Sequence, residues 1–336
     1  MPGISLIICC YNSARTIQET LKHIFGQELS PDQAWEVLLV NNNSSDNTVD
    51  LAREMASQNE HIDFKIVDEP RAGLSYARET GVRSTKYPVI SFVDDDNLIP
   101  KNWVAYMSEK FSDENVGVLG CTAIGRFDVE PPEWYTKDHH KFAFATGRLY
   151  AGAPFLDITQ DALLFGAGLT LRKEIFEKLW QRHWEPLLMG RKGQVQTGGD
   201  DSEITLAARL LGYRLFFTDE VKLTHWITGN RLSLERLKKM TAGFGMADVF
   251  LLAYNYCYFE KEGQLSPVFR LRRYWWFNYF GKSLAFLKAK LKSYLGRDKF
   301  DQEINSIRAK AFCQCLLAER KKFNQSFDQV RKLVNA

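Results

Sequence analysis

Apolar positions in the first hundred residues alternate between two periods, one typical of strands and one typical of helices. Continuous apolar runs of strand length recur at residues 4–10, 35–40, 64–67 and 89–93. Between these runs, apolar residues return every three or four positions, as at Ile17, Leu21 and Ile24, which indicates helices with one face on a sheet. The alternation predicts an α/β fold with a doubly wound, mostly parallel sheet and ligands at the carboxyl ends of its strands.

Polar clusters follow three of these strands directly, at residues 9–12, 41–46 and 94–96. Because parallel strands end at the same edge of a sheet, we expect the three clusters to line one crevice. The last cluster, the acidic triplet of residues 94–96, places three carboxylates at the end of a buried strand. Cations or hydrogen-bond donors must offset their repulsion and lost hydration. The triplet alone fits either a metal site or a solvated polar loop.

The middle of the chain contains an aromatic, proline-rich segment at residues 128–155. Trp134, Tyr135 and Tyr150 in this segment could stack on a ligand, or they could form the buried side of a long loop. We expect a lid or a loop beside the site.

The chain becomes helical after Arg231, and its positive charge concentrates in one part of this region. Residues 264–297 contain eight basic residues and no acidic one, interleaved with aromatic residues. Such a segment fits an anionic membrane surface. It also fits a helical hairpin that packs its aromatics on the preceding α/β domain or between two subunits of a homodimer. Nucleic-acid binding is not expected, because no recognition motif accompanies the charge.

Composition indicates a globular protein with reduced cysteines. The 336 residues are 45% hydrophobic and 25% charged, as in ordinary globular proteins. The six cysteines form no CxxC pair and no zinc spacing, which predicts reduced thiols. No signal peptide is evident, and the longest apolar stretch, at residues 249–259, is too short to span a bilayer. We therefore expect a cytoplasmic protein whose membrane contact, at the inner face of the cell membrane, is at most peripheral.

Several motifs, taken in order, resemble family 2 glycosyltransferases of the GT-A fold. They are CYN after the first strand, VNNNSSDNT, EPRAGLSYARETG, FVDDDN, FGAG, GGDDSE and the later His225. Each motif alone is weak, but their joint order is specific, and the resemblance covers about the first two thirds of the chain. It implies a catalytic GT-A domain at residues 1–229 and a C-terminal helical, basic-aromatic region at residues 230–336.

The resemblance implies a metal-dependent enzyme that uses a nucleotide-diphosphate sugar, with a UDP-sugar favoured. Asp94 and Asp96 would be the outer pair of the DxD motif, with Asp96 the direct ligand of Mn²⁺ or Mg²⁺. Asp95 would contact the ribose or support the metal. His225 would complete the metal or diphosphate site, although a lone histidine after a strand also fits a structural role.

The resemblance also implies where the nucleoside lies. Cys9, Tyr11, Asn41 and Asn42 match the positions that hold the base and ribose. Asn41 stands where aspartate is common in the family, which weakens the preference for UDP. Arg78 matches a basic residue that faces the base or diphosphate, and a surface arginine on an amphipathic helix is the alternative.

Asp201 matches the catalytic carboxylate of the family. As general base it would deprotonate an acceptor hydroxyl and invert the anomeric configuration, with Asp200 orienting it. The acceptor implied is a growing glycan or a lipid-linked saccharide. Trp134, Tyr135 and Tyr150 would then stack on a sugar ring on the acceptor side of the site. The alternative is an acid-rich helix start that the helix dipole favours without catalysis.

Two other functions stay open. A catalytically inactive nucleotide-sugar-binding scaffold would keep the fold, although Asp96 and Asp201 are both present. A sugar nucleotidyltransferase should carry a glycine-rich, basic signature after its first strand, and the sequence CCYNSART lacks those glycines.

Overall fold

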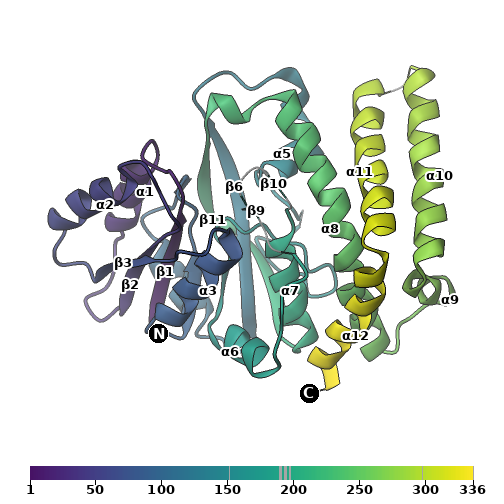
Figure 1. Cartoon of the computed structure of the whole chain (residues 1–336). Helices are drawn as coiled ribbons and strands as arrows, with labels where there is room; N and C mark the ends of the chain where they lie inside the picture. Colours follow the sequence, from purple (N-terminus) through teal and green to yellow (C-terminus); the bar gives the residue numbers. More distant parts are fainter. Residues whose placement is uncertain (151, 189–190, 193–194, 197, 297, 336) are drawn as a thin grey trace. The chain divides into compact units, whose positions relative to one another are not determined.

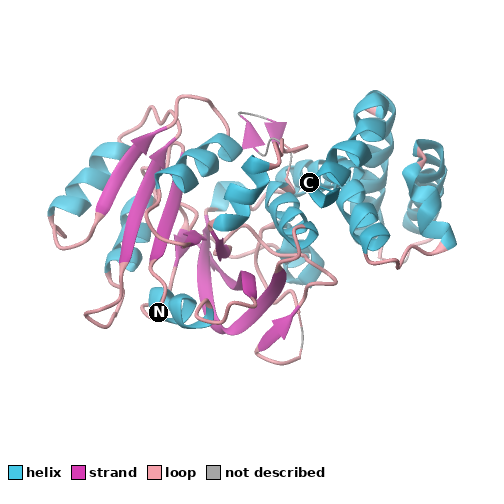
Figure 2. Cartoon of the chain, turned by 90° about the horizontal axis from the view of Figure 1, so that it is seen from below, coloured by secondary structure: helices cyan, strands magenta, loops and turns pink. Residues whose placement is uncertain are grey.

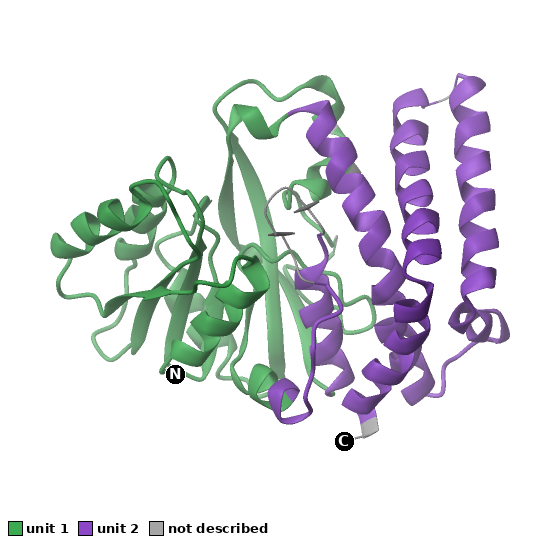
Figure 3. Ribbon diagram, in the orientation of Figure 1, with its two compact units in different colours: residues 1–178, 212–232 green, residues 179–211, 233–336 purple. Residues whose placement is uncertain are grey.

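The computed structural model describes residues 1–150, 152–188, 191–192, 195–196, 198–296 and 298–335. The chain forms two compact units, shown in Figure 3. Unit 1 comprises residues 1–178 and 212–232, and unit 2 comprises residues 179–211 and 233–336. Residues 179–211 thus group with the C-terminal helices. The domains expected at residues 1–229 and 230–336 remain a prediction.

Unit 1 is built on an α/β sheet. Its elements are β1 (Ile4–Cys10), α1 (Ile17–Phe25), β2 (Trp35–Asn41), α2 (Thr48–Ser57), β3 (Phe64–Asp68), α3 (Leu74–Ser84), β4 (Val89–Phe92), β5 (Asn97–Leu98), α4 (Trp103–Lys110), β6 (Val116–Phe127), η1 (Glu133–Thr136), α5 (Asp138–Ala143), β7 (Phe155–Asp157), β8 (Thr170–Arg172), β11 (Arg214–Ile227) and η2 (Gly229–Arg231). Helix α6 (Glu174–Gln181) crosses into unit 2.

The nine-stranded sheet has the order β3-β2-β1-β4-β8-β6-β11-β5, with β7 also paired to β11. The four strands from β3 to β4 are parallel to one another, as the sequence predicts. Beyond them, the short β8 runs antiparallel to both β4 and β6, and β11 is parallel to β6. The sheet is therefore parallel in its N-terminal half and mixed in the rest (Figures 1 and 2).

Helices cover both faces of the parallel strands. Leu6 and Ile8 on one face of β1 belong to the same core as Ile17 and Leu21 of α1. On the other face, Ile7 approaches Gly81 of α3 so closely that a Cβ added there would lie 2.5 Å from the Ile7 side chain. This two-sided burial explains why β1 is a continuous apolar run.

Unit 2 is mainly helical. Its elements are β9 (Arg191–Lys192), β10 (Val195–Gln196), α7 (Asp200–Leu210), α8 (Leu234–Lys261), α9 (Pro267–Arg270), η3 (Leu271–Arg273), α10 (Trp275–Tyr294), α11 (Lys299–Ala318) and α12 (Arg320–Asn335). This C-terminal helical extension confirms the helical character predicted after Arg231.

The long helices of unit 2 pack closely. A Cβ added at Gly245 of α8 would lie 2.3 Å from the backbone oxygen of Arg308 in α11, so only glycine allows this approach. Next to it, Arg308 Nε and Nη2 each donate to the Asp248 carboxylate at 2.8 Å. Among the described residues, no helix is both long and apolar enough to cross a membrane.

Candidate active site

The loops after β1 and β2 are joined by hydrogen bonds. The Asn12 side-chain oxygen accepts from the Ser45 amide at 2.8 Å, and the Asn12 amide donates to Ser44 Oγ at 3.1 Å. The Ala14 amide donates to the Asp46 carboxylate at 3.0 Å. The polar clusters at residues 9–12 and 41–46 therefore form one edge of the sheet, as we expected.

Three of the expected nucleoside contacts, Cys9, Tyr11 and Asn41, lie on this edge with an acid that the sequence interpretation missed. Asn41 Nδ2 donates to Asp68 Oδ1 at 2.8 Å, because the register of β2 and β3 pairs the two residues. Asp68 is exposed and ends β3. Tyr11 is 61% exposed, and Cys9 is partly buried. The signal for Asp68 was its place at the end of a predicted strand.

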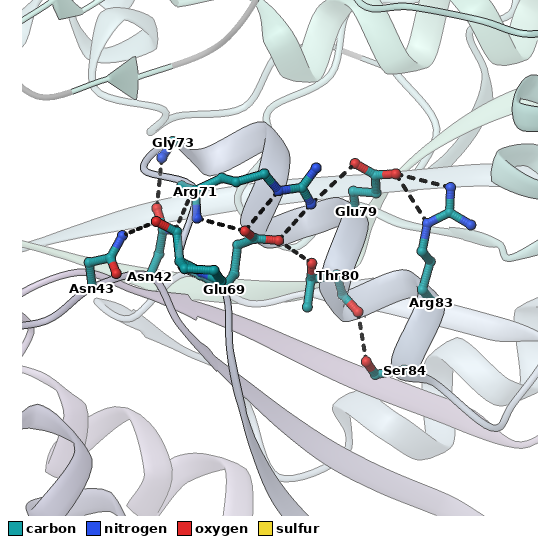
Figure 4. A network of polar contacts seen from close by, with 10 residues as sticks. Asn42, Asn43, Glu69, Arg71, Gly73, Glu79, Thr80, Arg83 and Ser84 are labelled. Carbon is teal, nitrogen blue, oxygen red and sulfur yellow. Dashed lines mark hydrogen bonds and ion pairs between the residues drawn. The ribbon is translucent and has the colours of Figure 1, made fainter.

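Asn42 is buried and shapes the next loop (Figure 4). Its oxygen accepts from the Gly73 amide at 2.8 Å, and its Nδ2 donates to the backbone oxygens of Glu69 and Arg71, both at 2.8 Å. Each hydrogen-bonding position of the amide faces the backbone of residues 69–73. Asn42 therefore connects the end of β2 to the start of α3, and its direct contact with a donor stays a prediction.

Glu69 holds this loop from its other side. Its carboxylate accepts two bonds from the Arg71 guanidinium, at 2.9 and 2.7 Å, and another bond from Thr80 Oγ1. Figure 4 shows that Glu79 extends the network from Arg71 to Arg83. The Arg71 bonds lower the pKa of Glu69 to about 2 against the effect of burial. The EPRAG segment is thus a fixed turn before α3.

Arg78 is buried on α3, with its guanidinium 5.4 Å from the centre of the Phe92 ring. It is therefore not the surface arginine of the alternative interpretation. Phe92 ends β4 two residues before Asp94, so Arg78 lies beside the end of that strand.

Asp95, in the middle of the triplet, points toward α1. Ser13 Oγ donates to its carboxylate, and Thr20 Oγ1 donates to its backbone oxygen at 2.9 Å. Burial, and then the negative charge of Asp96, raise the pKa of Asp95 to about 7. The triplet is thus bound to the segment after β1, which places two of the predicted polar clusters side by side.

Asp96 is almost buried and contacts two basic side chains. His225 Nε2 lies 3.4 Å from Asp96 Oδ1, and Arg231 Nη1 bonds to Asp96 Oδ2. The pairing of His225 with Asn97 between β11 and β5 creates this arrangement, and the Trp226 amide donates to the Asp96 backbone oxygen at 2.8 Å. The sequence indicated Asp96 and His225, but it gave no signal for Arg231.

The charge around Asp96 favours its ionised form. Burial opposes ionisation, but the neighbouring His225 and Arg231 hold the pKa of Asp96 well below its usual range. Asp95 and Asp96 therefore differ in acidity although they are neighbours, because only Asp96 has close basic partners.

A divalent metal fits this location only with help from a substrate. Among the residues that the structure describes, no group of three or more His, Cys, Asp or Glu side chains could hold an ion by itself. Asp96 and His225 supply one carboxylate and one imidazole, and the buried His225 Nδ1 has no hydrogen-bond partner within the described part of the chain. Two such ligands suit an ion that takes its remaining ligands from phosphates and water.

Asp200 and Asp201 start α7 and lie in unit 2, whereas the other predicted site residues lie in unit 1. Gly199 precedes them with φ at +97°, and a Cβ there would lie 2.9 Å from Ala247. The position thus requires glycine. The Asp201 carboxylate accepts from the Ser202 amide at 2.8 Å.

A third acid of this segment, Glu203, was not singled out from the sequence. Its buried carboxylate accepts from the amides of Leu187 and Leu188 at 2.6 and 2.9 Å and from the Tyr254 hydroxyl at 2.7 Å. Trp184 Nε1 donates to the same hydroxyl at 2.8 Å. Burial raises the pKa of Glu203 to about 7. Glu203 therefore connects α7 to the segment before β9 and to α8.

The three predicted acceptor-side aromatics are packed within unit 1. Tyr135 is buried against Phe127, with ring centres 5.0 Å apart. The Trp134 ring centre lies 6.2 Å from that of Tyr135. The Tyr150 hydroxyl donates to the Leu163 oxygen at 2.9 Å. A role in sugar binding stays a prediction.

The strand order of the sheet is that of the GT-A fold, which solved glycosyltransferase structures share. The mannosyltransferase PcManGT from Pyrobaculum calidifontis, solved with GDP-Man and Mn²⁺, is 18% identical with a TM-score of 0.53, over 99% of this chain and 85% of that chain. S. aureus TarS 1–349, solved with UDP-GlcNAc, is 14% identical with a TM-score of 0.51, over 99% of this chain and 90% of that chain. At these identities the likeness shows the fold.

The sequence gives the family. The family described as "Glycosyl transferase family 2" matches residues 5–180, more than half of the chain, and the chain belongs to this family of glycosyltransferases. A poly-beta-1,6-N-acetyl-D-glucosamine synthase of Staphylococcus epidermidis is 34% identical over 110 residues, which are 32% of this chain and 25% of that protein. Glycosyltransferase AglE of Haloferax volcanii is 30% identical over 120 residues, 36% of this chain and 39% of that protein. The matches thus span well under half of these relatives.

Proposed function

We propose that this glycosyltransferase moves a sugar from a UDP-sugar to a hydroxyl of a glycan or lipid-linked saccharide, with inversion and with Mn²⁺ or Mg²⁺. The observation that carries the proposal is Asp96 between His225 and Arg231, on an edge that already presents the polar loops of β1 and β2. TarS was solved with UDP-GlcNAc and PcManGT with Mn²⁺, which supports a nucleotide-sugar donor and a divalent metal.

The nucleoside is proposed to bind at Cys9, Tyr11 and the Asn41–Asp68 pair. Tyr11 has an exposed ring that can stack on a base. Asn41 offers an amide that donates and accepts, as a uracil edge requires, and Asp68 supplies the carboxylate that the family pattern leads one to expect at position 41. Asp68 therefore compensates for the missing aspartate and restores the preference for UDP.

The diphosphate is proposed to bind at Asp94, Asp96 and His225. Asp96 and His225 would hold the divalent ion, with phosphate oxygens and water as its other ligands, and Asp94 would complete the acidic motif beside it. The ion would supply Lewis-acid neutralisation of the leaving diphosphate. The Arg231 guanidinium already contacts Asp96 and can donate to phosphate oxygens from the same position. Arg78, beside Phe92 at the end of β4, and Asp95 are assigned supporting roles at this site.

Acceptor activation is assigned to Asp201. As general base its carboxylate would take the proton of the attacking hydroxyl, with Asp200 orienting it. Glu203 holds the start of α7 in place through its bonds to Leu187 and Leu188. Trp134, Tyr135 and Tyr150 remain the proposed acceptor-side aromatics.

A thermal-shift screen with UDP-, GDP- and CDP-sugars, each with and without Mn²⁺, tests the donor. Stabilisation by a UDP-sugar that depends on Mn²⁺ is expected. An assay of UDP release in the presence of saccharide acceptors separates an enzyme from an inactive scaffold, because a scaffold would bind the donor without releasing UDP.

Two partner proposals concern residues 264–297, the acid-free basic region. The first is an anionic membrane surface, and the second is another copy of the chain in a homodimer. The exposed residues of α10 favour the first proposal, for the reasons that follow.

A further inference from the structure

Helix α10 exposes a continuous apolar stripe to solvent. The stripe consists of Trp276, Phe280, Leu284, Leu287, Leu291 and Leu295, the last residue following the helix end. Phe280, Leu291 and Leu295 are 67%, 61% and 72% exposed. The opposite face of α10 carries the buried Asn278 and Ala289 and packs on α11, beside which α10 lies in Figure 1.

The spacing of the stripe places its members on one side of the helix. Successive members are three or four residues apart, which keeps them within one face at about 100° per residue. Exposed apolar residues in soluble proteins are normally scattered singly, and a contiguous row marks an interaction surface. The stripe therefore points to a partner outside unit 2, since all of its side chains stay largely exposed although α10 packs on α11.

Basic residues border the stripe on both sides. At about 100° per residue, Lys288 and Lys292 lie beyond one edge and Lys290 beyond the other, and all three are exposed. No acidic residue occurs between Gln264 and Gly296. The surface thus combines an apolar centre with positive margins.

This charge pattern decides between the two partners. Two copies that paired through their stripes would bring lysine margins together, with no acidic residue on either α10 to offset the repulsion. An anionic bilayer offers hydrocarbon to the stripe and phosphates to the lysines, and Trp276 suits the headgroup level.

We propose that α10 lies on an anionic membrane surface, with its stripe in the boundary between headgroups and acyl chains and with Lys288, Lys290 and Lys292 at lipid phosphates. Such a surface would keep the enzyme where a lipid-linked acceptor is found. The proposal is independent of the metal and donor assignments, because it rests on exposed residues of α10 alone.

Co-sedimentation of the full chain with vesicles tests this proposal. We expect binding to vesicles of phosphatidylcholine and phosphatidylglycerol, and much weaker binding to phosphatidylcholine alone. The triple variant Phe280→Ser, Leu284→Ser, Leu287→Ser should lose binding by at least about tenfold, because each side chain inserts apolar area. The matched control is Leu317→Ser, since Leu317 is 50% exposed on α11 outside the stripe. This control should bind like the native chain.

A second variant changes charge without removing apolar area. Lys288→Gln, Lys290→Gln, Lys292→Gln should reduce binding to anionic vesicles by about tenfold or more and should weaken its dependence on salt. Equal sedimentation of the native chain and both triple variants would overturn the proposal. A dimer in sedimentation velocity that only the stripe variant abolishes, without vesicle binding by the native chain, would also overturn it and would identify a second copy as the partner.

Thermal stabilisation by the donor, measured on the same variants, distinguishes a failure of membrane docking from a failure of the proposed function. It should be unchanged in the stripe and lysine variants, because these residues are far along the chain from the donor site and exposed. Vesicle binding without donor binding would leave membrane docking standing and would refute the proposed function.

Discussion

Arg231 and Asp96 form an ion pair between residues that are 135 positions apart in the chain. The pair forms because β11 runs antiparallel to β5 and returns the chain to the acidic triplet. A basic side chain thus reaches the carboxylate that the motif order identified as the metal ligand. Arg231, which the sequence interpretation did not name, is therefore the first position at which to test donor binding.

Arg231→Ala should weaken UDP-sugar binding by about ten- to a hundredfold, because the diphosphate loses a charged donor. Arg231→Lys should recover part of the affinity, since it keeps the charge without the planar fork. Isothermal calorimetry with Mn²⁺ measures both. Combining Arg231→Ala with Asp96→Asn in a double-mutant cycle gives the coupling between the two residues. Affinity that does not respond to Arg231→Ala would exclude the residue from the donor site.

Asp201→Asn should abolish transfer and preserve donor binding. The asparagine amide is not basic at neutral pH, so it cannot accept the proton of the acceptor hydroxyl. We expect kcat to fall by at least about a hundredfold. Glu262→Gln, on an exposed residue of the same unit, is the control. Turnover of Asp201→Asn at the native rate would remove the base assignment.

Glu203 should make stability depend on pH. Its folded-state pKa, raised to about 7, exceeds the ordinary value of 4.5, so the folded state holds the proton more tightly than the unfolded chain. Its contribution to stability is therefore full below about pH 4.5 and is lost as the pH rises to about 7. The loss is on the order of 3 kcal/mol.

Urea unfolding between these pH values measures this contribution. Glu203→Gln cannot titrate, so its free energy of unfolding should change less over that interval than that of the native chain. Glu262→Gln should keep the native slope. If Glu203→Gln also kept the native slope, the pH dependence of the free energy of unfolding would not originate from the Glu203 carboxyl group.

The sequence predicted the parallel half of the sheet well. Continuous apolar strands such as β1 are readable because both of their faces are buried, and the polar residues that follow them end at one edge. The strands of the mixed half could not be predicted from the sequence. Strands β8 and β5 have three and two residues, too few to show a period, and β11 contains a register shift between Thr218 and Lys222.

The same distinction holds for the site. Asp96 and His225 were indicated by the order of motifs, and the structure places them together. Arg231 and Glu203 were missed because their partners are fixed by tertiary packing, which leaves no local spacing to read. Asp68 could have been found by asking which acid ends the strand beside Asn41.

The central claim is that Asp96 and His225 bind a nucleotide-sugar diphosphate through a divalent metal. Calorimetric titration of UDP-GlcNAc into the native chain and Asp96→Ala, with Mn²⁺ and with EDTA, tests it most directly, with Asp32→Ala as an exposed control. We predict that Mn²⁺ strengthens binding by the native chain and the control, and that Asp96→Ala loses this gain. The same gain from Mn²⁺ in all three proteins would contradict the claim.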